Sequence, residues 1–313
     1  MMSATLKPPR FSIVTPSFNQ AGYLGETLRS IADQSYPNVE HVVVDGGSTD
    51  ASAELLRAHE SQLKFWVSEK DRGQTHAINK GMAHAEGEIL AYLNSDDYYL
   101  PGCFGAVAKA YHDHPDADLF VGRCRYVSET GETIGGQFGE ISTYEEILDL
   151  WKVWWGGRQF VQPEIFWTKR IADKVGAFNE SLHYVMDYDY WARILKAGGK
   201  VVRIDRELTA FRFTPEQKSN QSRAVALELL ELIRPWLWDP TTPIGDATRR
   251  RLKAWWAYDA RFLQQRDRMV ANGTPRLQRW ASLLREMISH PRMITCPGFR
   301  QSLGTIVAGN SNT

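Results

Sequence analysis

The stretch "LAYLNSDDYYLPG", Leu90 to Gly102, contains the pattern from which the fold can be predicted. An apolar run typical of a buried β-strand ends at Leu93, and a polar turn with Asp96 and Asp97 follows directly. Two adjacent carboxylates disfavour each other's ionisation unless a cation lies beside them. At this point the aspartates have two interpretations: a solvated turn before the next helix, or oxygen ligands for Mg²⁺ or Mn²⁺.

Strand and helix patterns alternate around this stretch. Runs typical of β-strands occur at residues 11–15, 38–45, 63–69 and 87–93, with helical spacing between them. This alternation predicts an α/β fold with a mostly parallel central sheet between helices. Ligands of such sheets bind at the carboxyl ends of the strands, so the polar turns after the first, second and fourth strands are candidate sites.

The pattern changes towards the end of the chain. Long helical patterns with almost no strand signal begin near Ser222. We therefore expect an α/β domain over residues 1–220 and a helical extension over residues 221–313.

Composition excludes several classes of protein. With 43% hydrophobic and 24% charged residues, the chain is expected to form a packed core. No segment approaches the roughly 20 apolar residues that span a bilayer, and no signal peptide is expected because the first ten residues lack an apolar core. Three widely separated cysteines fit neither a disulfide framework nor a metal site. We expect a cytoplasmic protein.

The basic end of the chain has two interpretations. Residues 249–313 contain twelve Lys and Arg against three Asp and Glu, although the formal net charge of the whole chain is zero. Two amphipathic patterns lie there: Leu252, Trp255, Trp256, Phe262, Leu263 and Met269 in one, and Leu277, Trp280, Leu284, Met287 and Ile288 in the other. This segment either packs on the protein or on another subunit, or attaches to the inner face of a membrane.

Three further acidic residues are candidates for chemistry. Asp45 ends the second strand and precedes two glycines, where an acid can bond a nucleotide base or ribose; the alternative is an ordinary turn. Asp187 and Asp189 lie at the start of a helix in "HYVMDYDYW". A partly buried carboxylate suits a general base, whereas helix capping is the simpler explanation, better suited to Asp189.

A polar loop precedes the third helix pattern. In "EKDRGQTHAINKG", Arg72 and Gly73 come just before the helix start, where negative charge is favoured. Arg72 could pair with phosphate oxygens, or form a surface ion pair with Glu69 or Asp71.

Together, five motifs carry a resemblance that none carries alone. The order "VTPSFNQAGYL", "VVVDGGSTD", "DRGQTHAINKG", "LNSDDYYLPG", "GAFNESLHYVMDYDYWARIL" resembles the family-2 glycosyltransferases with the GT-A fold. The resemblance covers residues 11–213, about two thirds of the chain. It implies an inverting transfer of a sugar from a nucleotide-diphospho-sugar to a hydroxyl of a saccharide or lipid-linked saccharide, in cell-surface polysaccharide or glycoconjugate biosynthesis. No nucleic-acid partner is implied.

The resemblance also implies roles for donor-binding residues. It places the nucleotide-sugar half at about residues 10–100 and the acceptor half at about residues 101–220. In the first half, Pro16 and Phe18 would pack around the base and Asp45 would bond it. Arg72 and Gly73 would lie beside the nucleotide, and Asp96 near the ribose.

The metal ligand and the base follow from the same resemblance. It implies that Asp97 binds Mn²⁺ or Mg²⁺ and that Asp187 deprotonates the acceptor hydroxyl, which attacks opposite the nucleotide. Many relatives have a His in a pattern like "FR-x-H", where this chain has Thr214 in "FRFT". We therefore expect the ion to be held by Asp97, the diphosphate and water, or weakly.

An aromatic segment is the candidate acceptor wall. In "LWKVWWGGRQFVQPEIFW", Trp155 and its neighbours could stack on sugars, and Gln162 and Glu164 could bond hydroxyls. The equal alternative is that two of Trp154, Trp155 and Trp167 belong to the core.

Two other classes of function compete with catalysis of sugar transfer. A nucleotide-sugar binding protein without turnover would lack a working base, and the presence of Asp187 argues against it. A nucleotidyltransferase would need a basic triphosphate loop after the first strand, but "TPSFNQAG" contains no Lys or Arg.

Overall fold

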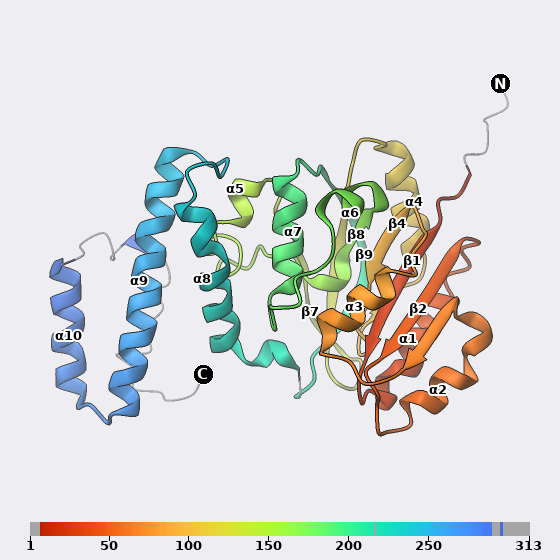
Figure 1. Ribbon diagram of the computed structural model, residues 1–313, viewed down its shortest axis with the longest axis horizontal. Helices are drawn as coiled ribbons and strands as arrows, with labels where there is room; N and C mark the ends of the chain where they lie inside the picture. Colours follow the sequence, from red (N-terminus) through yellow and green to blue (C-terminus); the bar gives the residue numbers. More distant parts are fainter. Residues whose placement is uncertain (1–6, 216, 290–294, 297–313) are drawn as a thin grey trace. The chain divides into compact units, whose positions relative to one another are not determined.

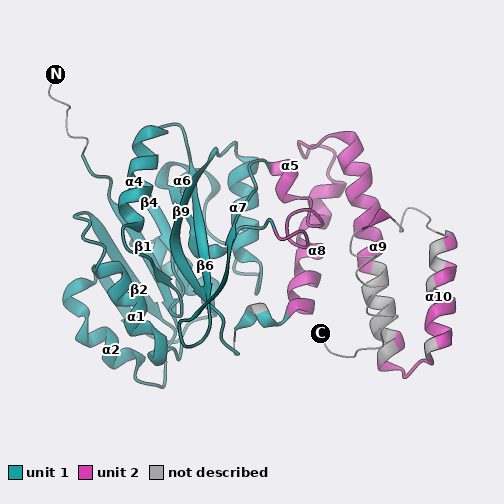
Figure 2. Cartoon of the chain, turned by 180° about the vertical axis from the view of Figure 1, so that it is seen from behind, with its two compact units in different colours: residues 1–143, 158–221 teal, residues 144–157, 222–313 magenta. Residues whose placement is uncertain are grey.

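The computed structural model describes residues 7–215, 217–289 and 295–296. The chain divides into two compact units, coloured separately in Figure 2. Unit 1 comprises residues 1–143 and 158–221, and unit 2 comprises residues 144–157 and 222–313. Residues 144–157, which the sequence placed in the α/β domain, thus belong by their contacts to the helical unit.

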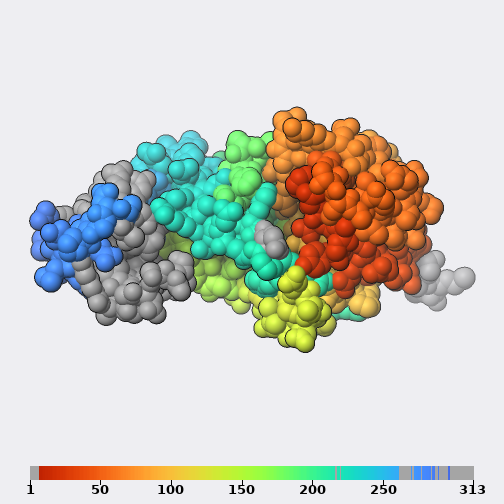
Figure 3. Space-filling model, turned by 90° about the horizontal axis from the view of Figure 1, so that it is seen from below, coloured from red at the N-terminus to blue at the C-terminus, as the bar shows by residue number. Residues whose placement is uncertain are grey.

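Unit 1 is built on a single mixed sheet (Figure 1). Its described strands are β1 (Phe11–Ser17), β2 (Val39–Asp45), β3 (Phe65–Ser68), β4 (Ile89–Tyr92), β5 (Tyr98–Tyr99), β6 (Leu119–Val127), β7 (Thr133–Phe138), β8 (Ile165–Thr168) and β9 (Val201–Arg212). Their order is β3-β2-β1-β4-β8-β6-β9-β5, and β7 pairs with β6 as an antiparallel hairpin. In Figure 3 this hairpin, coloured yellow, projects from the surface of unit 1.

Parallel pairing is concentrated in the first half of the sheet. Strands β3, β2, β1 and β4 run parallel, whereas β8 pairs antiparallel with both β4 and β6. The predicted α/β class is confirmed, and the antiparallel pairs lie in the second half. In the parallel half the carboxyl ends meet at one edge, where Ser17, Asp45 and Ser68 are register neighbours.

Helices cover both faces of this sheet. They are α1 (Ala21–Ala32), α2 (Ser52–Ala58), α3 (Gln74–Met82), α4 (Cys103–Asp113), α6 (Lys169–Val175) and α7 (Met186–Lys196). Val14 faces Gly81 of α3, where an added Cβ would lie 2.4 Å from a Val14 methyl. Val43 packs with Leu24 of α1 and Leu56 of α2. Val14 pairs with Val42, the residue before Val43, so these helices lie on opposite faces.

Unit 2 is helical. It contains α5 (Tyr144–Ile147), α8 (Ser222–Trp238), α9 (Asp246–Ala271) and α10 (Arg276–Ser289). Its core combines apolar residues of α8 and α9 with Trp151, whose indole packs edge-on against Trp255 at 5.5 Å between ring centres. Asp149 accepts a hydrogen bond from Arg251 at 2.7 Å. The short segment 144–157 is therefore a structural part of the helical unit.

The two amphipathic patterns of the basic end differ in burial. Leu252 and Trp255 of α9 are buried, but Leu277, Leu284 and Ile288 of α10 are 53–85% exposed. The side chains of Phe262, Leu263 and Met287 lie outside the described residues. Within the described part of the chain, no helix is both long and apolar enough to cross a membrane.

A buried carboxyl group in unit 2 predicts a pH-dependent stability. Asp259 accepts a hydrogen bond from Trp151 Nε1 at 2.5 Å and lies against Cys296. Burial raises the pKa of Asp259 from 3.8 to about 6. The folded state therefore holds more protons than the unfolded state between these values, so this group's stabilising contribution is present at low pH and is lost as the pH rises through about 6.

Asp259→Asn removes this titration while keeping an acceptor for Trp151. We compare the free energies of unfolding of the variant and of wild type at two pH values. Their difference is expected to change by about 2 kcal/mol in favour of the variant when the pH is raised from 4 to 7.5. Urea unfolding at both pH values measures the gain. A difference between variant and wild type that does not change with pH would contradict the assignment.

Candidate functional site

The turn after β4 buries one carboxylate oxygen without a partner. Asp97 is 1% exposed, and its Oδ1 accepts a hydrogen bond from the Arg212 backbone N–H at 2.9 Å. Its Oδ2 is buried and has no hydrogen-bond partner in the described part of the chain. Burial raises the pKa of Asp97 well above its ordinary value, and the adjacent Asp96 carboxylate raises it further. The Arg212 N–H, the Asn94 side chain and the Arg212 charge lower this pKa without offsetting burial, so a cation close to Oδ2 would further stabilise the anion.

Asp96 lies beside this oxygen with its side chain partly buried. Its Oδ2 accepts a hydrogen bond from Gln217 Nε2 at 3.4 Å, and burial raises the pKa of its carboxyl group. The turn therefore concentrates two carboxylates whose charges disfavour each other. Among alternatives for "NSDD", this burial favours a ligand site over a solvated turn.

The donor set fits a hard divalent cation that retains open positions. Asp97 Oδ2 and the Asp96 carboxylate are oxygen donors of the kind Mg²⁺ and Mn²⁺ accept. Thr214, at the place where many relatives of the resembled family carry a His, is buried. Across the residues described, no group of three or more His, Cys, Asp or Glu side chains could hold a metal ion. Such an ion would need further oxygens from a ligand or from water.

Arg212, at the end of β9, fixes the geometry of this turn. Its side chain is 4% exposed and donates from Nε to the carbonyl of Asp96 at 3.1 Å and from Nη1 to the carbonyl of Glu129 at 2.9 Å. Its Nη2 pairs with Glu26 of α1. Thr27 on the same helix donates to the backbone carbonyl of Asp97 at 2.7 Å. The turn is thus held from β9 and α1 simultaneously.

Asp45 is buried at the end of β2 and its oxygens are already engaged. Its Oδ2 accepts from the Ser48 N–H at 2.9 Å and from Ser68 Oγ at 2.6 Å. Of the two first-loop residues, Pro16 is buried within β1 and Phe18 is 58% exposed. The structure therefore places a fixed acid and an exposed aromatic ring at the carboxyl ends of neighbouring strands.

The loop before α3 is joined to the loop before α7. Arg72 pairs with Glu180 at 2.7 Å, and not with Glu69 or Asp71 as the simpler sequence interpretation had it. Gly73 has φ of 116°, which favours glycine, and its N–H bonds Asp71 Oδ1 at 2.7 Å. Asn79 of α3 bonds the backbone of Phe178 in both directions at 2.9 Å. These bonds set the path of the chain into α7.

The buried ring of Tyr92 lies within electrostatic reach of both Asp187 and Asp97, the acid of the turn after β4. Asp187 is half-buried in the first turn of α7, and its Oδ1 accepts the N–H of Tyr188 at 2.7 Å. Burial raises the pKa of the Tyr92 hydroxyl well above its ordinary value, and the charges of Asp187 and then Asp97 add to this. One buried ring on β4 thus lies within electrostatic reach of both carboxylates, although they are far apart in sequence.

Asp189 has a structural partner. It is 4% exposed and pairs with Arg193 one turn later at 2.8 Å, while Arg193 also bonds the carbonyl of Val175 at 2.7 Å. No side-chain cap bond is present at the start of α7. Asp189 therefore does not cap its helix: it pairs within α7 with Arg193, and Arg193 in turn joins α7 to the end of α6 through the Val175 carbonyl.

Gln162 belongs to an amide network next to this turn. It donates to the Tyr92 carbonyl at 2.6 Å and accepts from Asn94 Nδ2 at 3.1 Å. Asn94 in turn accepts from Gln74 Nε2 at 2.8 Å, and Gln74 accepts from Lys218 at 3.4 Å. The network links four segments around the end of β4.

The other acceptor-wall candidates lie elsewhere. Glu164 is fully buried, and its Oε1 accepts the N–H groups of Val161 at 3.0 Å and Gly139 at 3.2 Å. Burial raises the pKa of this carboxyl group well above its ordinary value. Trp155 belongs to unit 2 and packs on Trp151 at 5.6 Å between ring centres. Trp167 is fully buried in the core of unit 1.

Sequence reasoning missed the residues that hold the site together. Arg212, Asn94, Gln74 and Gln217 are not in the predicted set, although Arg212 is the Arg of the "FR" pair and Asn94 is the Asn of "NSDD". In the sequence, these two motifs drew attention to other residues: Thr214 in the first motif and Asp96 and Asp97 in the second. The bonds that give these residues their roles span 20 to 186 positions and have no local signal.

The sequence profile of Glycosyl transferase family 2 matches residues 12–176, more than half of the chain. The chain belongs to this family. The match includes the strands and turns that carry Asp45, Asp96 and Asp97, and it ends before Asp187.

Curated relatives of this family member align over only part of their length. An uncharacterized glycosyltransferase of Mycobacterium tuberculosis is 40% identical over 92 residues, 29% of this chain and 35% of the relative. One from Rickettsia typhi is 26% identical over 64% of this chain and 62% of the relative. TuaG of Bacillus subtilis, a putative teichuronic acid biosynthesis glycosyltransferase, is 36% identical over 28% of this chain and 36% of the relative. The chain thus spans between about one third and three fifths of these relatives.

Solved structures share the GT-A fold. TarS 1-349 of S. aureus in complex with UDP aligns with a TM-score of 0.61 and 20% identity, over 80% of this chain and 71% of that one. Mannosyltransferase PcManGT from Pyrobaculum calidifontis, in complex with GDP-Man and Mn2+, aligns with a TM-score of 0.58 and 18% identity, over 94% and 85%. These similarities establish the architecture of the family-2 protein and no more.

Proposed function

We propose that this family-2 glycosyltransferase transfers a sugar, with inversion, from a nucleotide-diphospho-sugar to an acceptor hydroxyl, using Asp187 as general base. One observation supports the proposal: the charges of Asp187 and Asp97 both contribute to the raised pKa of the buried Tyr92 hydroxyl, so both candidate carboxylates lie within electrostatic reach of β4. Solved proteins with the same fold are named as complexes with UDP-GlcNAc and with GDP-Man.

The donor half of the site is assigned to unit 1. Asp45, held by Ser48 and Ser68, would accept hydrogen bonds from the base through whichever lone pairs these serines leave open. Phe18, which is exposed in the turn after the neighbouring strand β1, would cover the base. Pro16 would set the path of that loop. Arg72 and Gly73 would lie beside the nucleotide, with Arg72 exchanging or sharing its present partner Glu180.

A divalent cation, Mn²⁺ or Mg²⁺, would be held by Asp97 with Asp96 near the ribose. When bound, it would neutralise charge on the leaving diphosphate. Asp97 Oδ2, buried and without a partner in the described residues, is the donor that such an ion would satisfy. Arg212 would keep this carboxylate oriented through its backbone N–H.

The proposed base acts on the side of the reacting carbon that lies opposite the leaving nucleotide diphosphate. A single carboxylate behind the nucleophile suits an in-line displacement, because the acceptor oxygen must lose its proton as it attacks. Asp187 is half-buried at a helix N-terminus, where a negative carboxylate is favoured. Gln162, adjacent to Tyr92, is the better-placed acceptor contact, whereas Glu164 and Trp155 would contribute to acceptor binding only through the segments they hold.

A saccharide of the cell surface, free or lipid-linked, is the acceptor class we propose. The support is the name of one relative, TuaG, which is described for teichuronic acid biosynthesis. The alternative of an inactive nucleotide-sugar binding protein predicts the same donor site without need for Asp187.

Asp97→Asn tests the donor and metal assignment. In wild type, a nucleoside diphosphate with Mn²⁺ is expected to raise the melting temperature, because a ligand that binds only the folded state stabilises it. In the variant, the increase in nucleotide affinity that Mn²⁺ causes is expected to fall by about tenfold or more. Substitution of residues that only support metal ligands already costs about 10–100-fold in metal affinity. Titration calorimetry of UDP and GDP with and without Mn²⁺ measures this directly.

Asp173→Asn is the matched control. Asp173 is an exposed aspartate of α6 that pairs with Lys169, and its loss should leave nucleotide binding unchanged. The metal-site assignment fails if Asp97→Asn binds the nucleotide with the same Mn²⁺ dependence as the wild type and the control. Binding of neither nucleotide by wild type would remove the donor assignment itself.

A further inference from the structure

Three aromatic rings converge on one side of the sheet in unit 1. Tyr126 of β6 lies 6.1 Å from Phe211 of β9 and 5.2 Å from Phe213, and the two phenylalanines lie 5.1 Å apart, all measured between ring centres. Tyr126 and Phe211 are register partners, and Phe213 follows Phe211 by two residues, so the three side chains point to the same side. We call this cluster the aromatic face.

The aromatic face is open to a ligand. Phe213 is 40% exposed, and Tyr126 and Phe211 are half-buried. On the adjoining strand β7, Gly135 is the register partner of Tyr126, and a Cβ added to this glycine would lie 3.6 Å from the tyrosine ring. Because glycine has no side chain, β7 leaves this part of the ring uncovered. The Tyr126 hydroxyl has no hydrogen-bond partner among the described residues.

The aromatic face adjoins the turn that carries Asp97. The backbone N–H of Arg212, the residue between Phe211 and Phe213, donates to Asp97 Oδ1 at 2.9 Å. Consecutive Cα atoms are about 3.8 Å apart, so both phenylalanines leave the backbone within one residue of this bond. A ligand on the rings would therefore lie close to the carboxylate assigned to the donor's cation.

The alternation of β6 puts its charges on the other side of the sheet. Cys124, two residues before Tyr126, is buried and lies within electrostatic reach of Asp97. Arg125, between Cys124 and Tyr126, faces the opposite way and pairs with Glu207. The side of β6 that lies towards Asp97 thus presents a ring to solvent rather than the Arg125 charge.

A saccharide suits such a surface. The faces of aromatic rings carry partial negative charge and the C–H groups of a pyranose carry partial positive charge, so a sugar packs flat on a ring while its hydroxyls bond polar groups at the rim. A second protein fits less well. A standard protein interface covers about 800 Å² on each partner, much more than one partly exposed ring and two half-buried rings offer.

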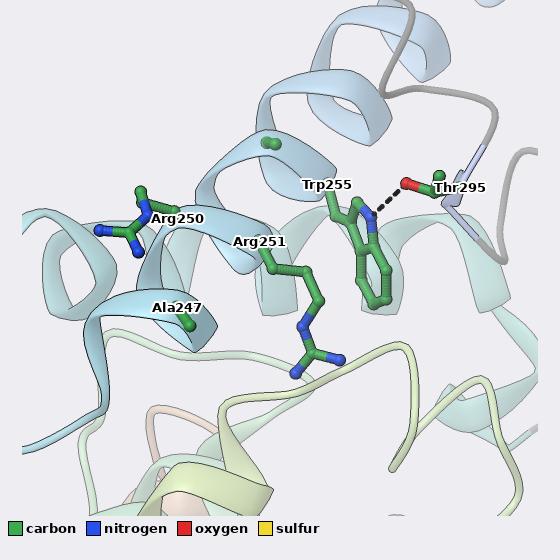
Figure 4. Close-up of a pocket in the computed structure, with 6 residues that line it drawn as sticks. Ala247, Arg250, Arg251, Trp255 and Thr295 are labelled. Atoms are coloured by element: carbon green, nitrogen blue, oxygen red, sulfur yellow. Dashed lines mark hydrogen bonds between the residues drawn. The ribbon is translucent and has the colours of Figure 1, made fainter.

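The cavity beside α9 in unit 2 has a different character (Figure 4). It measures about 280 Å³, and Arg250 and Arg251, which line it, point in different directions. Arg251 pairs with Asp149 at 2.7 Å, and its charge also acts on Glu145. The charges of this cavity are therefore partly balanced within unit 2, whereas the rings of the aromatic face converge.

We propose that the aromatic face binds the saccharide acceptor. A pyranose ring packs on Phe213 and Tyr126, the Tyr126 hydroxyl bonds a hydroxyl of the saccharide, and Phe211 supports both rings through edge-on contacts. The role as acceptor site rests on the proposed sugar transfer, whereas the binding of a saccharide does not.

Two substitutions test the aromatic face in different ways. Phe213→Ala removes its most exposed ring, and Gly135→Val covers Tyr126 without removing it. The added Cβ would make ordinary contact with the ring and valine is favoured in strands, so β7 should be preserved. The full-length proteins are applied to a printed array of bacterial surface oligosaccharides, and the saccharide that wild type retains best is titrated calorimetrically. We expect each variant to bind it about tenfold more weakly, the effect of losing one aromatic contact.

Ile134→Ala is the matched control. Ile134 precedes Gly135, is 58% exposed and faces the other side of β7, so this variant should bind the saccharide like wild type. Titration of the same samples with UDP or GDP and Mn²⁺ checks the fold and the donor site, and we expect equal values for all four proteins. Absence of nucleotide binding in wild type would remove the donor assignment and leave the saccharide result interpretable.

The proposal is overturned if the array retains no wild-type protein, or if Phe213→Ala and Gly135→Val bind the saccharide as Ile134→Ala does. Sedimentation velocity tests a second copy of the chain as the occupant of the aromatic face. A wild-type dimer that Phe213→Ala converts to a monomer would assign the face to self-association and would also overturn the proposal.

Discussion

Asp187→Asn is expected to reduce sugar transfer at least a hundredfold while donor binding stays near the wild-type value. General-base catalysis contributes roughly 10²–10⁴-fold to such reactions, and an amide cannot accept the proton. The substitution keeps an oxygen that can accept the Tyr188 N–H, so the first turn of α7 should be preserved. Steady-state transfer assays combined with calorimetric binding of the nucleotide separate catalysis from binding.

Asp189→Asn is the matched control for this prediction. It lies two residues further along the same helix, but its carboxylate pairs with Arg193 and is 4% exposed. We expect this variant to lose stability and to keep most of its transfer rate per folded molecule. The reverse result, near-normal turnover in Asp187→Asn and a hundredfold loss in Asp189→Asn, would reassign the base to Asp189.

Arg212→Ala is expected to lower the free energy of unfolding by about 3 kcal/mol. The substitution removes the donors to the carbonyls of Asp96 and Glu129 and leaves space between the rings of Tyr23 and Tyr98, which lie 5.2 and 5.5 Å from the guanidinium. Glu26 is half exposed and can be rehydrated, so it adds little to the cost. The backbone N–H that bonds Asp97 remains, but the turn loses its support.

Arg125→Ala provides the comparison on the neighbouring strand β6. Arg125 pairs with Glu207 at the surface at 2.5 Å, and such exposed pairs contribute about 0.2–1 kcal/mol. Urea unfolding of both variants measures the difference. Equal stability of the two would show that Arg212 does not hold the turn, and the described network would not have the importance assigned to it.

Local pattern was sufficient to predict the architecture and to place Asp45 and Asp97 at strand ends, while the roles of these acids stay predictions. The alternation of strands and helices fixes which turns meet at the carboxyl edge, so Asp45 and Asp97 are both found at strand ends in the parallel half. The antiparallel placement of β8 between β4 and β6 has no such signal, because strand order in the second half depends on long-range pairing. The helices after residue 222 were also predictable from the helical spacing of apolar residues alone.

Partner choice was not predictable from neighbouring residues. Arg72 pairs with Glu180, 108 positions away, when Glu69 and Asp71 are adjacent in sequence. Glu164 has the composition of an acceptor contact, but its carboxyl group is enclosed and holds two backbone N–H groups. In both cases the tertiary path of the chain, rather than residue type, decides which atoms face a ligand.

The division of residues 144–157 from their sequence neighbours limits how the protein can be shortened. Leu148, Leu150 and Trp151 are each no more than 2% exposed, and Trp151 packs against Trp255 and donates to Asp259, both of which lie beyond residue 222. A truncation after Gln221 would therefore present an uncovered tryptophan-rich loop to solvent, a surface prone to aggregation. A clean separation of the α/β part requires replacing this internal loop as well as removing the carboxyl-terminal helices.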